Sequence, residues 1–68
     1  MLLAKQILLE REESQLQLSY KAQVSPSDVS RYMSGERKPY PNHAQRIADA
    51  LGWTGEPKEL FEEVVKND

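Results

Sequence analysis

The clearest hydrophobic pattern in this chain lies between residues 15 and 33. Leu18 and Ala22 are four residues apart, so they share one face of a helix, and Val24 follows at a bend. Apolar residues then recur at i, i+3 and i+4, where they are Val29, Tyr32 and Met33. This spacing predicts two short helices, joined by a tight turn, that pack together through these apolar positions.

Capping and turn signals define the first helix of this pair. Ser14 and Gln17 form an S-x-x-Q capping box, which predicts that the helix begins at Gln15. The free backbone amides at that helix end can bind a phosphate, and a purely capping role for this end is an equal alternative. Gln23 falls where the chain reverses. Glycine is normally favoured there, because a left-handed backbone is unfavourable by about 1 kcal/mol for a residue with a side chain.

The second helix of the pair is predicted from Pro26 to Met33. Ser25 is a favoured N-cap residue, Pro26 is suited to the first helical position, and Asp28 completes an S-x-x-D form of the capping box. Gly35 follows the last apolar position and supplies the stop signal. Because start and stop signals agree, the helix boundaries are well defined.

Three further helices are predicted outside this pair. Residues 1–12 form the first, with inward positions at Leu3, Ala4, Ile7 and Leu8. Residues 41–51, between a starting proline and a terminal glycine, form another, with a stripe of Ala44, Ile47, Ala48 and Leu51. Residues 57–66 form the last, with Leu60, Phe61, Val64 and Val65 on one side. That final stripe either caps the core or makes a dimer contact, and both alternatives are open.

Length and charge narrow the class of protein. The 68 residues make a single domain, residues 1–68, and the absence of cysteine excludes disulfides and thiolate metal sites. The net charge of −2 is unevenly divided: residues 1–20 sum to −1, residues 21–46 to +3 and residues 47–68 to −4. We expect a soluble, cytoplasmic protein with no membrane segment, whose positive middle either meets an anionic partner or is a solvated surface.

The polar face of the helix at 26–33 suggests what that partner is. Its members are Ser27, Ser30 and Arg31, followed by Ser34. A small, polar face with one arginine suits a helix that enters the major groove of double-stranded DNA and reaches base edges. Lys21, Arg37 and Lys38 are candidates for phosphate contacts. Alternatively, the Arg–Lys pair in the loop only improves solubility.

The same residues give no indication of an enzyme. His43 is the only histidine, and the chain has neither a glycine-rich phosphate loop nor clustered carboxylates, so no nucleophile–base pair can be named. His43 falls on the polar side of its helix and is predicted to be a surface residue, with no metal and no cofactor. The remaining alternative is a protein-interaction module of the same fold, antitoxin-like or regulator-binding, that uses the acidic C-terminal helix.

The segment QLQLSYKAQVSPSDVSRYMSGERKP resembles the helix-turn-helix of the Cro/C1-type (XRE) family of phage repressors and bacterial regulators, and RIADALG resembles that family's fourth helix. The resemblance implies an all-α, compact five-helix domain like that of lambda repressor. It further implies a transcriptional regulator, such as a phage or bacterial repressor, in which helix 26–33 reads DNA bases. Homodimers of this family usually form through the C-terminal region.

Individual positions carry specific implications from the resemblance. Gln15 matches a phosphate contact of the family, whereas Pro26, Ser27 and Arg31 match positions that read bases. The loop at 37–38 matches the basic loop that touches the DNA backbone. We accordingly expect base contacts from Pro26, Ser27, Ser30 and Arg31, and phosphate contacts from Gln15, Lys21, Arg37 and Lys38.

The chain departs from the family pattern at several positions. Glu13 stands where an apolar residue is usual, and Gln23 replaces the turn glycine. An ion pair that many relatives form between the first helix and the recognition helix is replaced here by Leu8 and Met33. An apolar pair can substitute for a buried ion pair with little loss of stability.

Overall fold

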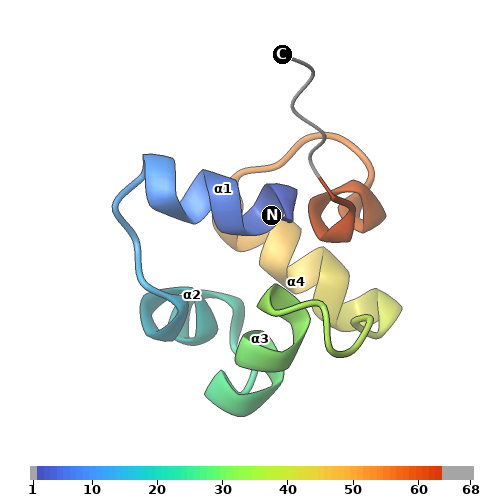
Figure 1. Ribbon diagram of the computed structural model, residues 1–68, viewed down its shortest axis with the longest axis horizontal. Coiled ribbons are helices and arrows are strands. Elements are labelled where there is room, and N and C mark those ends of the chain that lie inside the picture. Colours follow the sequence, from blue (N-terminus) through green and yellow to red (C-terminus); the bar gives the residue numbers. More distant parts are fainter. Residues whose placement is uncertain (1, 64–68) are drawn as a thin grey trace.

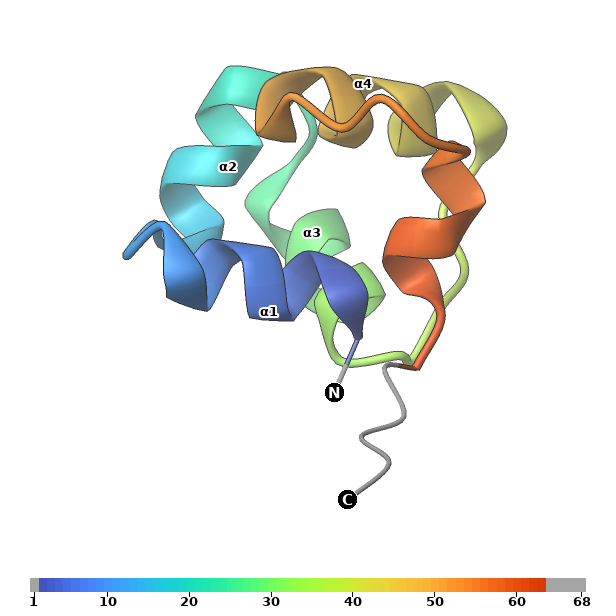
Figure 2. The same ribbon diagram turned by 90° about the horizontal axis from the view of Figure 1, so that it is seen from above.

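The computed structural model describes residues 2–63, which form a small helical domain (Figures 1 and 2). Four α-helices are followed by one 3-10 helix: α1 Leu3–Glu10, α2 Gln15–Ala22, α3 Pro26–Met33, α4 Pro41–Leu51 and η1 Pro57–Phe61. The predicted all-α class is confirmed, and α2, α3 and α4 begin at the predicted residues. Figure 2 shows α1, α2, α4 and η1 as a ring, with α3 behind the central space.

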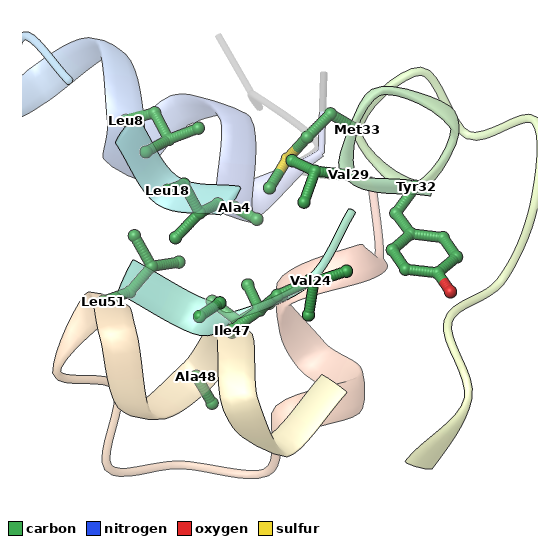
Figure 3. Close-up of a cluster of buried hydrophobic side chains, with 12 residues drawn as sticks. Ala4, Leu8, Leu18, Val24, Val29, Tyr32, Met33, Ile47, Ala48 and Leu51 are labelled. Carbon is green, nitrogen blue, oxygen red and sulfur yellow. The ribbon is translucent and has the colours of Figure 1, made fainter. Parts of the chain in front are cut away.

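The core fills the centre of this arrangement with the apolar positions that the sequence indicated (Figure 3). Leu18, Val29, Tyr32 and Ile47 are fully buried, and they come from α2, α3 and α4. Leu8 and Met33 belong to the same cluster, so these two positions are part of the apolar core. Trp53 packs against the edge of this core, and its indole N–H donates to the carbonyl of Glu56.

Local signals account for most helix ends. The Ser14–Gln17 capping box is present, with both reciprocal hydrogen bonds. Gln23 is left-handed, with φ 56° and ψ 42°, as expected for the residue that reverses the chain. The Ser25 side chain, by contrast, accepts no capping hydrogen bond, so the predicted second capping box is wrong. The start of α3 therefore depends on Pro26 and on the charge of Asp28 in the first turn.

The end of the described chain differs from prediction. In place of the start of the α-helix predicted over residues 57–66, η1 ends at Phe61, and Glu62 is extended, with φ −97° and ψ 150°. Residues 64–66 of that prediction lie outside the described residues. The Leu3 N–H donates to the Glu62 carbonyl at 3.1 Å, and Leu2 forms an antiparallel bridge with Glu63. These long-range bonds engage the backbone groups that a continuing helix would need, so the fifth α-helix is replaced by a short 3-10 helix.

A charged cluster joins α1, α2 and α4. Arg11 Nη1 donates to the carbonyl of Leu51, the last residue of α4, at 2.7 Å. Arg11 Nε also lies 3.2 Å from Glu13, whose other carboxylate oxygen is 3.0 Å from Lys21 Nζ. The lysine approaches outside hydrogen-bond geometry, so that contact is electrostatic. This cluster explains how a mostly buried glutamate is accommodated at position 13.

Candidate nucleic-acid interface

Helix α3 presents a polar face to solvent. Pro26, Ser27, Ser30 and Arg31 are all exposed, whereas the opposite face enters the core. Ser27 and Arg31 stand one turn apart, at i and i+4, so their side chains emerge from the same side of the helix. The structure thus brings together the four residues predicted to contact bases. In Figure 1 this helix lies at the lower edge of the molecule.

The guanidinium of Arg31 is available for a partner. Among residues 2–63 no carboxylate forms an ion pair with it, and this includes Asp28, one turn earlier on the same helix. Its planar set of donors matches paired acceptors such as guanine O6 and N7. The arginine can therefore bind a base edge or a phosphate without first breaking an internal ion pair.

The loop after α3 carries two further cations, one of which lies next to Arg31. Gly35 is left-handed at φ 80°, and the N–H groups of Glu36 and Arg37 donate to the Arg31 carbonyl at 3.0 and 3.4 Å. The loop folds back over the helix end, so Arg31, Glu36 and Arg37 line one shallow hollow. Arg37 and Lys38 are exposed, and neither has an ion-pair partner in the described part of the chain.

Gln15 occupies the first position of α2 and is partly exposed. The capping box engages the N–H groups of Ser14 and Gln17, at 2.9 and 3.1 Å. The amides of Gln15 and Leu16 lie in the first turn, where a helix has no internal acceptors for them. Gln15 thus combines a side-chain amide with free backbone donors.

Lys21 does not belong to this group of residues. Its ammonium contacts Glu13, and it lines a separate hollow with Gln23, Arg46 and Asp49, between α2 and α4. The ion pair neutralises much of its charge locally. The expected phosphate contact of Lys21 stays a prediction, and it would require the lysine to exchange its contact with Glu13 for a phosphate.

His43 is not a simple surface residue, and that prediction is wrong. It is half-buried, and its Nδ1 lies 2.8 Å from the hydroxyl of Tyr32 on α3. The Tyr40 ring also meets the imidazole edge-on, with centroids 5.6 Å apart. Burial raises the pKa of Tyr32, and the negative charge of Asp28 raises it further. Nothing in the sequence pattern indicated this contact, because the two partners are eleven residues apart on different helices.

The residues proposed for a dimer contact occupy different environments. Leu60 is fully buried, so its side chain belongs to the core of the monomer and is no longer a contact candidate. Phe61 is half-buried and meets the Tyr32 ring edge-on at 6.3 Å. Val64 and Val65 lie outside the described residues.

The described residues hold no group of three or more His, Cys, Asp or Glu side chains that could bind a metal ion. None of the helices between residues 2 and 63 is long and apolar enough to cross a membrane. What they do form is a pair of short helices joined by a left-handed turn, whose second helix exposes a polar face: a helix-turn-helix.

A family model described as helix-turn-helix matches residues 5–56. The chain belongs to the Cro/C1-type helix-turn-helix (XRE) family of DNA-binding transcription regulators. No curated protein and no solved structure matches it. Members of this family are generally not enzymes.

Proposed function

We propose that this protein binds specific sites in double-stranded DNA and regulates transcription there, as a phage or bacterial repressor. Helix α3 enters the major groove, which is about 12 Å wide and admits a single helix. Ser27, Ser30 and Arg31 then face base edges, and Pro26 offers an apolar surface to a thymine methyl group. Gln15, Arg37 and Lys38 hold the phosphates on either side.

The observation that carries this proposal is the positive charge exposed on α3 and on the loop that follows it. Arg31, Arg37 and Lys38 are exposed on α3 and on the loop that follows it, and none of them has an ion-pair partner within residues 2–63. Arg31 and Arg37 line one hollow together with Glu36. In contrast, the cations Arg11 and Lys21 are both paired with Glu13, in the loop between α1 and α2. A chain of net charge −2 that exposes these unpaired cations on and beside α3 is suited to a polyanionic partner that docks at this helix.

The proposal extends to a homodimer. A two-fold axis would place two copies of α3 about 34 Å apart, one turn of DNA, and the bound site would then be pseudo-palindromic. Each subunit by itself contributes only a few base contacts, because Pro26 has no hydrogen-bond donor on its side chain. Two half-sites supply the discrimination that one subunit lacks.

Selection of bound sequences from a random DNA pool, followed by mobility-shift titration, tests the proposed function. A single enriched motif, bound more tightly than a scrambled duplex of equal composition, is the expected result. A reporter gene carrying that motif in its promoter should be expressed less when the protein is present. If no sequence is enriched and DNA is retained only with an added protein partner, the chain is a protein-interaction module of the same fold.

A further inference from the structure

Tyr32 is unusual among the core residues because one end of its side chain leaves the core. The residue is fully buried, and its ring packs against Phe61. Figure 3 shows the ring at the edge of the apolar cluster, with the hydroxyl pointing away from the other labelled side chains. That hydroxyl lies 2.8 Å from His43 Nδ1, in the first turn of α4. A tyrosine phenol carries its proton at neutral pH, so the hydroxyl can donate to Nδ1 in the tautomer that leaves this nitrogen as an acceptor.

This hydrogen bond adds a polar link between α3 and the start of α4, which otherwise meet through apolar core residues. Helix α3 packs mainly on α2. The first half of the loop after α3 is tied to that helix, because the N–H groups of Gly35, Glu36 and Arg37 donate to its last carbonyls. The second half leads into α4, and it includes Pro39, which has no N–H to donate. Arg37 therefore moves with α3, whereas Lys38 lies next to the segment that leads into α4.

His43 is the point where these two parts meet. Its Nδ1 contacts Tyr32 of α3, and its ring meets both Tyr32, at a centroid distance of 5.9 Å, and Tyr40, at 5.6 Å. Tyr40 immediately precedes α4 and lies two residues from Lys38. A change in the Tyr32–His43 contact would therefore shift α3, with Arg31 and Arg37, relative to Lys38.

We infer that Tyr32 and His43 are positioning residues for DNA binding: their hydrogen bond holds the base-reading face of α3 in register with the phosphate-binding end of the loop. Neither residue touches DNA. Charges that must meet phosphates at fixed spacings lose contacts when displaced by about 1 Å, even if all of them remain present. The inference depends on the proposed DNA-binding function.

Tyr32→Phe removes the hydroxyl and keeps the ring in the core. Affinity for the selected DNA site should fall about three- to tenfold, the range that corresponds to the net contribution of one hydrogen bond. Tyr20→Phe is the matched control, because it deletes the same group from a tyrosine that is 71% exposed on α2. Its affinity should stay within about twofold of the wild type. Both titrations are made well below the melting temperature of each variant, so that only folded protein is compared.

Substitutions of His43 distinguish a positioning role from a contribution to stability alone. His43→Leu should weaken binding as much as Tyr32→Phe, and the double variant should lose no more than either single variant, because all three lack the same bond. His43→Asn retains an acceptor close to the position of Nδ1 and should recover most of the affinity. The salt slope of Tyr32→Phe should also decrease by about one phosphate contact.

Equal affinity of all folded variants would show that the pair contributes only to stability, and additive losses would show that the two residues act separately. Either result overturns the inference but leaves the proposed function intact. If the wild-type protein itself binds no DNA, both fail, and this is evident before any variant is compared.

Discussion

Gln23 ends α2 with a left-handed backbone, a conformation that glycine adopts without the steric penalty of a Cβ atom. Gln23→Gly should therefore raise the free energy of unfolding by up to about 1 kcal/mol, reduced by the greater entropy of glycine in the unfolded chain. DNA affinity should not change, because the side chain lies outside the α3 surface. Thermal melts measure the effect.

Glu12 provides a matched comparison for this substitution. It is left-handed as well, at φ 54°, and it lies in the exposed α1–α2 connection. Glu12→Gly should therefore also raise the free energy of unfolding. A clear loss of stability in Gln23→Gly alone would mean that its side chain makes a favourable contact that outweighs the backbone strain.

Substitution of Arg31 can distinguish a role in base recognition from a general contribution to DNA affinity. If its guanidinium binds guanine, Arg31→Ala should abolish the preference at one guanine position, a loss of about 1–3 kcal/mol of discrimination, while the preferences at other positions persist. Titration against the selected site and its single-base variants measures this. Uniform weakening on every sequence, with a salt slope smaller by about one, would instead assign Arg31 to a phosphate.

The sequence could predict the conformation of some single residues but not the contacts of others. The left-handed Gln23 was predictable, because a capped helix before it and a start signal after it leave room only for a tight turn. The environment of His43 was not predictable, because it depends on Tyr32 reaching across from another helix. The pairing of Glu13 with Arg11 and Lys21 was hidden for the same reason: contacts between helices are set by tertiary packing and leave no local pattern.

The loop between α3 and α4 should contribute through charge, and not through base recognition. Arg37→Ala and Lys38→Ala are each expected to reduce the slope of log K against log salt by about 0.9, with the base preference unchanged. Lys21→Ala also removes one positive charge, but Lys21 is paired with Glu13. The salt slope of this variant should therefore match that of the wild type. An equal decrease in all three variants would mean that net charge, and not contact geometry, controls affinity.

At the level of helices, prediction succeeded where both ends carried local signals. The limits of α3 and α4 follow from prolines at their starts, and from Gly35 and Gly52, which adopt left-handed backbones after them. The last helix was overestimated because its apolar spacing looks helical, whereas the backbone of Glu62 is hydrogen-bonded to the start of α1. A periodicity argument cannot detect a competing partner sixty residues earlier in the chain.

The folded domain as a whole should depend on Phe61, whose ring contacts Tyr32 at the edge of the core. Phe61→Asp should lower the free energy of unfolding by about 2 kcal/mol, less than for a fully buried phenylalanine. Lys58→Asp introduces the same carboxylate at an exposed position of η1 and should have a much smaller effect. Urea unfolding gives both values.

Sedimentation equilibrium on the same variants tests the proposed homodimer. A wild-type dimer that becomes a folded, fully stable monomer in Phe61→Asp would identify Phe61 as an interface residue, contrary to the expectation above. A loss of stability with no change in association would place the ring in the core and the dimer contact elsewhere.

The bridge between Leu2 and Glu63 makes the fold a nearly closed ring of chain. Because the first and last described residues are neighbours, a short linker could join the two ends, and the chain could be reopened at the exposed Thr54–Gly55 loop. Such a circular permutant would keep α2, the turn, α3 and the basic loop in their original order, and it should fold and recognise the same DNA site. The order in which this chain is synthesised is therefore separable from the surface that we propose reads DNA.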